Sequence, residues 1–311
     1  MYKIKSTLKF VAALAAGLSL FACSKSGVED GNDTVATFVV SASNDPATKA
    51  VADNDGLAAN VNRCIMEIYY GGELYGRYVQ PMTDKESVFE NIPLVPGRTY
   101  DVCFWADCAT VDNSLEGFAD KYYTTSDGLT AVKMTAASYG ANDDMRDAFC
   151  KKQSYTVDAS KNQSFSTTLT RPFAQVNVIT TDVKAVKLAS LWPETVKLVY
   201  EAPTTYNVLS DELSDVKELT VSGDVYQAIN ADKDELTLAM DYLFSSSDKE
   251  VVSFDFAAKH GTDADIEFSF TNVPVQRNYR TNIKGALLTT TAKWNVTVDP
   301  MWIGEKDNVD E

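Results

Sequence analysis

The amino-acid sequence predicts an all-β protein with two tandem β-sandwich domains, and three observations support this. Short runs alternate between apolar and polar side chains, which is the pattern of a strand with one buried face. Turn residues such as glycine, proline and asparagine separate these runs. Helical periodicity is scarce, so we expect only minor helices, at 142–149 and 184–191, which lack alternation, proline and glycine.

The first half of the chain predicts one sandwich, at residues 34–170. Its alternating runs are residues 38–41, 64–70, 100–105, 155–157 and 165–169. Turn signals lie between them at Gly71-Gly72, Asn91-Ile92-Pro93, Pro96-Gly97 and Asp127-Gly128. We place the boundary near Thr170, because the following Pro172 removes a backbone donor and marks a break between strands.

The second half repeats this organisation at residues 171–303. Its alternating runs are residues 174–178, 196–200, 252–256, 266–270 and 294–298. Residues 304–311 form a polar, acidic tail. The 289 residues that follow residue 22 are enough for two domains of ordinary size.

The N-terminus is typical of a bacterial lipoprotein. Residues 1–22 contain Lys3, Lys5 and Lys9 followed by an apolar stretch, which is the layout of a cleaved signal peptide and is too short to span a bilayer. The segment Leu20-Phe21-Ala22-Cys23 resembles a lipobox, which makes Cys23 the lipidated residue. The alternative is an ordinary secretory signal followed by a chance cysteine.

Lipidation would anchor the protein to a membrane. Acyl chains contribute about 0.8 kcal/mol per buried methylene, so several of them hold a chain to a membrane almost permanently. Residues 23–33 then form a solvated spacer, in which Glu29 and Asp30 are a weak version of a surface-export signal. We expect a location on the outer membrane, at the cell surface.

The charge of the chain excludes one class of partner. The net charge is −16, and loss of the three signal lysines leaves about −19, which repels a phosphate backbone. We therefore expect no nucleic-acid partner.

Four cysteines remain after the lipidated one, namely Cys64, Cys103, Cys108 and Cys150. In an oxidising compartment they could form disulfides, and buried free thiols are the equal alternative. A zinc site requires closely spaced Cys or His pairs, and the only histidine is the distant His260. We expect neither a metal nor a cofactor.

No catalytic constellation is visible. The single histidine has no nearby serine elbow or cysteine partner, so we predict no enzyme activity. The acidic pairs Asp143-Asp144 and Asp234-Glu235 are interpreted as solvated loops. Residues 53–56 (DNDG) match only part of a calcium loop and are interpreted as a turn.

Clustered tyrosines leave glycan binding open as a second interpretation. Their rings could stack on the apolar faces of sugars, although adjacent tyrosines on a strand point to opposite faces, so one of each pair belongs to the core. The tyrosines concerned are Tyr69, Tyr70, Tyr75, Tyr78, Tyr122 and Tyr123.

Four longer sequence segments are more specific for a protein family than the patterns above. They are residues 100–107 (YDVCFWAD), 142–149 (NDDMRDAF), 169–178 (LTRPFAQVNV) and 273–300 (VPVQRNYRTNIKGALLTTTAKWNVTVDP). Together they resemble the fimbrillin-like lipoproteins of Bacteroidales, which are subunits and accessory proteins of type V pili. The resemblance spans residues 36–300 and implies transthyretin-like sandwiches.

The resemblance also implies a mechanism of assembly. In this family a trypsin-like protease removes an N-terminal strand, and the groove that this exposes accepts a strand from the next subunit. Residues 34–41 occupy the place of the removable strand, and Lys49 occupies the place of the cleavage site, where many relatives have arginine. Only nine residues follow Trp302, so a donor segment must lie largely within residues 294–303.

We therefore expect a non-enzymatic surface lipoprotein that serves as a structural or adhesive subunit of a fimbrium. Its partners would be other fimbrial subunits, joined by donor-strand exchange, together with the outer membrane and a host or glycan ligand. The alternative is a glycan-binding outer-membrane lipoprotein of a nutrient-uptake system.

Overall fold

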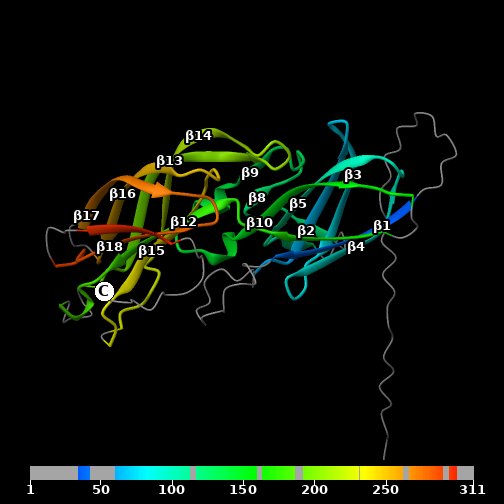
Figure 1. Ribbon diagram of the computed structural model, residues 1–311. Helices are drawn as coiled ribbons and strands as arrows, with labels where there is room; N and C mark the ends of the chain where they lie inside the picture. Colours follow the sequence, from blue (N-terminus) through cyan, green and yellow to red (C-terminus); the bar gives the residue numbers. More distant parts are fainter. Residues whose placement is uncertain are drawn as a thin grey trace, which may run out of the picture. The chain divides into compact units, whose positions relative to one another are not determined.

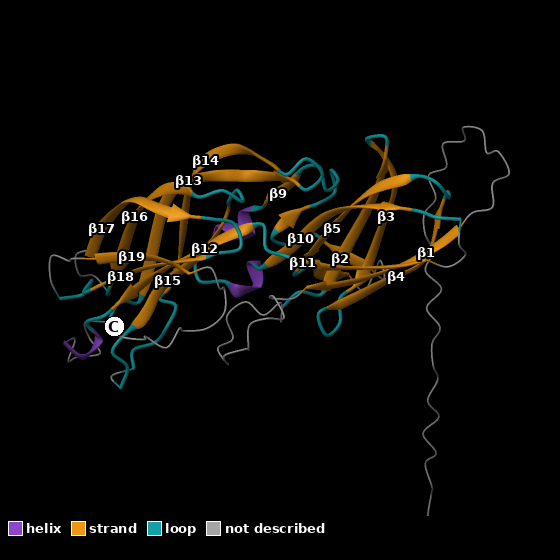
Figure 2. Ribbon diagram, in the orientation of Figure 1, coloured by secondary structure: helices purple, strands orange, loops and turns teal. Residues whose placement is uncertain are grey.

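Strands make up almost all of the regular structure. The computed structural model describes residues 34–42, 60–112, 117–159, 163–185, 192–230, 232–261, 266–289 and 294–299. Within these ranges it contains 19 strands and three short 3-10 helices, as Figure 2 shows. The predicted all-β class is confirmed.

Two sheets built from the first half of the chain form one sandwich (Figure 1). One sheet has the order β11-β1-β4 and the other the order β10-β5-β2-β3. Their inward side chains form a common core that includes Phe38, Phe89, Phe104 and Phe149. The strands are β1 (Thr34–Ala42), β2 (Arg63–Tyr70), β3 (Glu73–Pro81), β4 (Glu86–Leu94), β5 (Thr99–Asp107), β10 (Ala148–Thr156) and β11 (Gln163–Leu169).

Two further sheets form the second sandwich. One has the order β15-β12-β18-β19, and the other the order β17-β16-β13-β9-β8, with β14 also paired to β13. The strands are β8 (Tyr123–Thr124), β9 (Val132–Met134), β12 (Phe173–Thr180), β13 (Thr195–Asn207), β14 (Glu212–Asp224), β15 (Leu236–Phe244), β16 (Glu250–Lys259), β17 (Ile266–Val275), β18 (Arg280–Gly285) and β19 (Trp294–Asp299). A separate small hairpin joins β6 (Thr110–Asp112) to β7 (Gly117–Ala119).

The core of the second sandwich extends onto the first. β8 and β9 precede residue 170 in sequence, yet β9 pairs with β13. Ile65, Cys103 and Trp105 point away from the first core and belong to the same cluster as Phe173 and Phe244. The central strands β2 and β5 of this sheet are thus covered on both faces, which explains why β2 is buried at seven consecutive positions.

Two local predictions are wrong in detail. The expected turn at Asn91-Ile92-Pro93 lies inside β4, where one extra residue forms a bulge opposite β1 and Asn91 has a φ of 58°. The expected helix at 142–149 shrinks to the 3-10 turn η2 (Asp144–Arg146), because β10 already begins at Ala148. Of the helix expected at 184–191, the described part lies in η3 (Val183–Ala185). The third 3-10 helix is η1 (Ala136–Tyr139).

The turns at Gly71-Gly72, Pro96-Gly97 and Asp127-Gly128 are confirmed. Gly71, Gly97 and Gly128 all have a positive φ, a conformation in which a Cβ is strained. No helix within the described ranges is long and apolar enough to cross a membrane.

Candidate functional site

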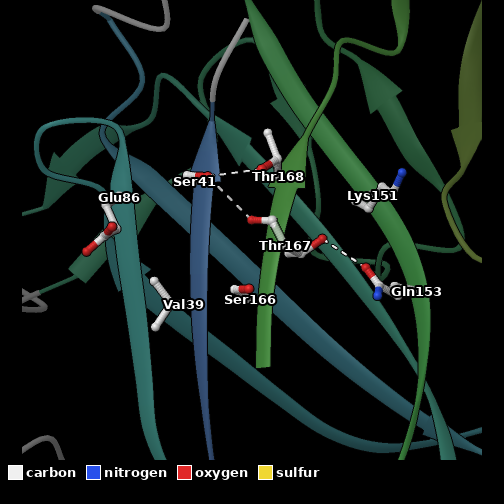
Figure 3. A pocket seen from close by; sticks show the side chains of 8 residues that line it. All are labelled: Val39, Ser41, Glu86, Lys151, Gln153, Ser166, Thr167 and Thr168. Atoms are coloured by element: carbon white, nitrogen blue, oxygen red, sulfur yellow. Dashed lines mark hydrogen bonds between the residues drawn. The ribbon is translucent and has the colours of Figure 1, made fainter. Parts of the chain in front are cut away.

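Strand β1 lies in the centre of its sheet, between two strands that do not pair with each other. It runs antiparallel to β4, with Thr34 opposite Leu94, and parallel to β11, with Ala36 opposite Gln163. Figure 3 shows β1 between these neighbours. Strands in a sheet lie about 4.8 Å apart, so without β1 a gap of two spacings would separate β4 from β11. We call this gap, together with the pockets beneath it, the β1 groove.

Alternate side chains of β1 fill the pockets of the groove. The buried positions are Thr34, Ala36, Phe38, Val40 and Ala42, whereas the residues between them are exposed or half-buried. Backbone pairing on both sides therefore gives the strand its affinity, and the pockets give it its register.

Phe38 occupies the largest of these pockets. Its ring centroid lies 5.2 Å from that of Phe165 on β11, 5.4 Å from that of Tyr155 on β10 and 6.2 Å from that of Phe104 on β5. Tyr155 and Phe165 also pack together, at 4.7 Å. Two sheets thus supply an aromatic box around one side chain of β1. The buried hydroxyl of Tyr155 has no hydrogen-bond partner within the described part of the chain.

The outer face of β1 borders a shallow polar cavity of about 300 Å³ (Figure 3). The Ser41 hydroxyl lies 3.4 Å from that of Thr168, and Thr167 donates to Gln153 at 3.1 Å. The hydroxyl groups, the Glu86 carboxylate and the Lys151 ammonium group could form hydrogen bonds with a polar ligand. The lining consists of Val39, Ser41, Glu86, Lys151, Gln153, Ser166, Thr167 and Thr168.

Two predicted site residues cannot be placed. Cys23, the predicted lipidation site, and Lys49, the predicted cleavage site, lie outside the described residues. Lys49 falls in the segment that connects β1 to the next strand.

The four remaining cysteines are buried free thiols, which is the second of the two alternatives. Cys64 belongs to the first core, whereas Cys103, Cys108 and Cys150 face the other side of the same sheet. Cys150 is opposite Trp105, so Cys103 is only its diagonal neighbour. Diagonal neighbours in a sheet lie about 7–8 Å apart, which is beyond the Cα separation that a disulfide spans without backbone movement.

The tyrosines do not converge on one platform. Tyr69, Tyr122 and Tyr123 are core residues, and Tyr69 donates to the buried carboxylate of Glu67. Tyr70 and Tyr75 are 42% and 41% exposed and flank the buried Tyr100, with centroids 5.4 and 5.2 Å away. The guanidinium of Arg98 lies 4.6 Å from the centre of the Tyr70 ring.

The acidic pairs have structural partners. Asp143 caps η2 by accepting from the Met145 amide, and the hydroxyl of Tyr226 lies 3.0 Å from Asp144. Asp234 and Glu235 form exposed ion pairs with Lys184 and Lys284. Within the described ranges no group of three or more His, Cys, Asp or Glu side chains could hold a metal ion.

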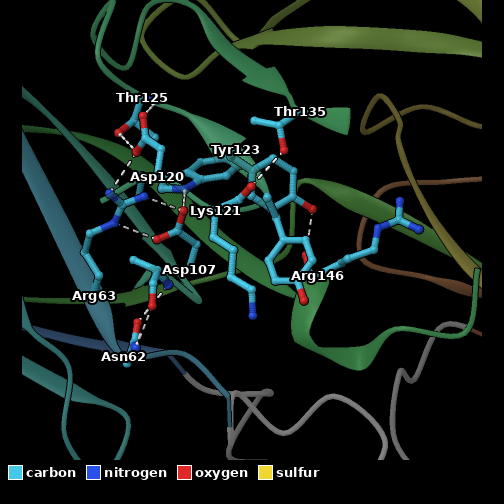
Figure 4. Close-up of polar contacts among 12 residues, drawn as sticks. Asn62, Arg63, Asp107, Asp120, Lys121, Tyr123, Thr125, Thr135 and Arg146 are labelled. Atoms are coloured by element: carbon cyan, nitrogen blue, oxygen red, sulfur yellow. Dashed lines mark hydrogen bonds and ion pairs between the residues drawn. The ribbon is translucent and has the colours of Figure 1, made fainter. Parts of the chain in front are cut away.

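Buried arginine–aspartate pairs stabilise the region where the two cores meet. Arg63 binds Asp107 with two hydrogen bonds, at 2.8 and 2.7 Å, and Asp120 with a third, at 2.8 Å (Figure 4). Asp107 also accepts from the indole of Trp105. Burial tends to raise the pKa of Asp120, but hydrogen bonds from Thr125 and Arg63 hold it below its usual value.

Two further pairs involve the segment around η2. Arg171 binds Asp147 through two hydrogen bonds of 2.7 Å, and burial raises the pKa of Asp147 to about 6 despite this pairing. Arg146 binds Asp241 on β15, which also accepts from the Tyr200 hydroxyl. These pairs were not predicted from the sequence, although Arg146 and Asp147 both lie in the segment 142–149 singled out there.

Comparisons with known proteins agree with this fold. Residues 28–311 match the model of a family described as a family of unknown function, DUF6562. No curated protein matches the sequence. Several solved structures share the fold.

Three of these structures illustrate the likeness. The tip fimbrial protein Mfa3 of Porphyromonas gingivalis has 11% identity and a TM-score of 0.52, covering 86% of this chain and 99% of that one. The fimbrial anchor protein Mfa2 of the same organism has 11% identity and a TM-score of 0.51, covering 86% and 97%. A candidate polysaccharide-binding protein of Bacteroides thetaiotaomicron has 12% identity and a TM-score of 0.53, covering 86% and 96%. At these identities the likeness concerns the fold.

Proposed function

We propose that this chain, which belongs to the DUF6562 family, is a non-enzymatic structural or adhesive subunit of a surface fimbrium. The observation that supports this most strongly is the arrangement of β1, which fills a groove between two strands that do not pair with each other. The fold is also that of fimbrial tip and anchor proteins.

The groove is suited to strand exchange after proteolytic trimming. A cut at Lys49 would leave β1 attached only by its hydrogen bonds and its five buried side chains. Loss of β1 would expose the edges of β4 and β11 and an apolar floor, and such an edge binds another strand readily. A strand from another subunit could then restore both ladders.

The chain itself contains a segment that could serve as a donor strand. Residues 290–298 repeat the pattern of β1, with an aromatic side chain in the middle, a small one two residues earlier and valine two residues later. The aligned residues are Thr290 with Thr34, Ala292 with Ala36, Trp294 with Phe38 and Val296 with Val40. At the last buried position Val298 is larger than its counterpart Ala42, so the match covers the first four positions. Its last part is β19, an edge strand that, among the described strands, pairs with β18 alone.

The location follows from the N-terminus. We propose that Cys23 carries the lipid that anchors the protein in the outer membrane, with residues 23–33 as spacer. Residues 34–170 and 171–303 are proposed as the two domains, with β8 and β9 of the first range completing a sheet of the second sandwich.

Limited proteolysis of the full chain tests this proposal. Trypsin under native conditions should cut first at Lys49, and the trimmed protein should then form oligomers that resist mild detergent, because its groove accepts strands from other copies. The variant Lys49→Gln should block cutting and assembly, whereas Lys249→Gln, at an exposed loop position away from the groove, should leave both unchanged. Trimmed protein that stays monomeric, alone and with other fimbrial subunits, would contradict strand exchange.

Glycan binding remains the second candidate, because Tyr70 and Tyr75 expose their rings on either side of Tyr100. A fold neighbour is also a candidate polysaccharide-binding protein. Soluble protein that lacks the lipid can be tested on a polysaccharide array. Selective binding that is lost in Tyr70→Ala but kept in Val111→Ala would favour this function.

A further inference from the structure

We infer that the β1 groove selects its incoming strand by an aromatic anchor side chain in the Phe38 pocket, flanked by alanine-sized side chains two residues before and four residues after the anchor. This inference rests on the proposed strand exchange and specifies the chemistry of the partner strand. It follows from the sizes of successive pockets along the groove.

The anchor pocket accepts a flat ring and is closed on all sides. Phe38 is only 1% exposed, although it lies in the outer sheet layer of its sandwich. Phe165 supports the ring from the neighbouring strand, while Tyr155 meets it edge to face at an interplanar angle of 79°. Phe89 lies opposite Phe38 on β4. Aromatic rings in such arrangements interact more favourably than their buried area alone predicts.

A branched aliphatic side chain would fill the anchor pocket poorly. It lacks the edge and face that Tyr155 and Phe165 contact, and it would leave part of the box empty. Empty space in a packed core costs free energy because the lining atoms lose their contacts. The pocket therefore distinguishes aromatic anchors from leucine or valine.

The flanking pockets exclude large side chains. Ala36 is opposite Ile92 and is 1% exposed, and Ala42 is opposite Leu169 and is completely buried. The Ala42 amide also donates to the Lys85 carbonyl at 2.9 Å, which fixes the backbone at this end of the groove. Extra atoms at either position would overpack the core.

The spacing of these pockets fixes the register of the incoming strand. Because successive side chains alternate between faces, a shift by one residue would turn the whole set outward. A shift by two residues would place the anchor in the pocket of Ala36 or in that of Val40, and both are smaller than the pocket of Phe38. Only a strand with its aromatic side chain at the correct position can keep both ladders and fill every pocket.

Peptide exchange tests the inference. The full chain would carry a site-specific protease sequence within residues 43–59, and after cutting it would be offered fluorescent nonapeptides. The first peptide is TVATFVVSA, which is β1 itself. The second is TVFTAVVSA, which has the same composition but exchanges the anchor with the small residue. A third, TVATLVVSA, replaces the aromatic anchor with leucine.

We expect the first peptide to bind the cut protein with at least about tenfold higher affinity than the second, as measured by fluorescence polarisation. Its affinity should also exceed that of the third peptide. Phe165→Ser should reduce the preference for the first peptide over the third, whereas Ser164→Ala, at the adjacent exposed position, should preserve it. Thermal unfolding of the cut protein before exchange checks that it remains folded.

The possible outcomes distinguish failure of the selection rule from failure of strand exchange. Equal uptake of all three peptides would overturn the selection rule while leaving strand exchange intact. Uptake of none of them, including the sequence of β1, by a folded cut protein would overturn strand exchange itself, and the selection rule with it.

Discussion

Phe38 and Tyr155 meet edge to face across the first sandwich, with ring centroids 5.4 Å apart, although 117 positions separate them in the sequence. One ring belongs to the strand that fills the groove and the other to the floor of the groove. The contact therefore exists only while β1 occupies the groove. It also connects the stability of the intact chain with the proposed strand exchange.

Substitution of Phe38 should weaken the precursor strongly. Phe38→Ala removes a fully buried ring and should lower the free energy of unfolding by about 3–5 kcal/mol. Chemical denaturation monitored by circular dichroism measures the change. Val35→Thr, at an exposed position of the same strand, should change stability by no more than about 0.5 kcal/mol. Similar effects of the two substitutions would show that β1 is not packed into the groove.

The thiols should be unreactive in the native protein. Burial raises the pKa of both Cys103 and Cys150 to about 12, so at neutral pH neither forms the nucleophilic thiolate. Iodoacetamide should label none of the four cysteines of the folded part natively, and all four after unfolding without reductant. Mass spectrometry that found a link between Cys64 and Cys103 would contradict the arrangement, because these residues face opposite sides of one sheet.

Lipidation is predicted to depend on one residue. Cys23→Ala should release the protein from the outer-membrane fraction, because the spacer and acidic domains offer no other strong membrane contact. Fractionation followed by a high-salt wash measures this, and Ser24→Ala is the matched control. A Cys23→Ala protein that stays with the membrane after the wash would show that lipid is not the anchor.

Acid stability should depend on Asp120. Because hydrogen bonds keep its pKa in the folded protein below the unfolded value of about 3.9, the carboxylate adds stability above that pH. This contribution is lost as the pH falls through the folded pKa. Asp120→Asn should therefore be less stable than the parent at pH 7, and the difference should shrink below about pH 4. The exposed Asp232→Asn variant should show no such convergence.

Alternation in the sequence predicts strands that have one buried face. It does not reveal strands in which a bulge or burial on both faces disrupts the alternation. β1 and β11 follow the period of two and were predicted. β4 was missed because the bulge at Asn91 shifts its buried positions from Phe89 to Ile92, a spacing of three. β15 was missed because it is buried on nearly all sides, so its apolar residues form a continuous run.

The candidate site was predicted only in part. The resemblance and the alternation identify β1, because its pattern is local. Its partners β4 and β11 and the aromatic box are determined by long-range pairing, which no local pattern encodes. The same holds for the buried ion pairs, since the partners Arg146 and Asp241 lie on segments whose proximity depends on the whole fold.

The Arg146–Asp241 pair, which joins η2 to β15, should be the most sensitive buried ion pair of the fold. Both side chains are at most 1% exposed, and Asp241 also accepts from the Tyr200 hydroxyl. Arg146 has further contacts with the carbonyls of Gly140 and Tyr242, so it remains buried when its partner changes. Asp241→Asn keeps the shape but removes the charge, which leaves a buried guanidinium without a counter-ion.

We expect Asp241→Asn to lower the free energy of unfolding by about 3–5 kcal/mol, as measured by urea denaturation. Lys133→Gln breaks an exposed pair with Asp127 and should cost no more than about 1 kcal/mol. The double variant Arg146→Met with Asp241→Leu should recover much of the loss, because it removes both buried charges together. If Asp241→Asn is no more harmful than Lys133→Gln, the pair does not hold η2 against β15, and the surrounding apolar core must do so alone.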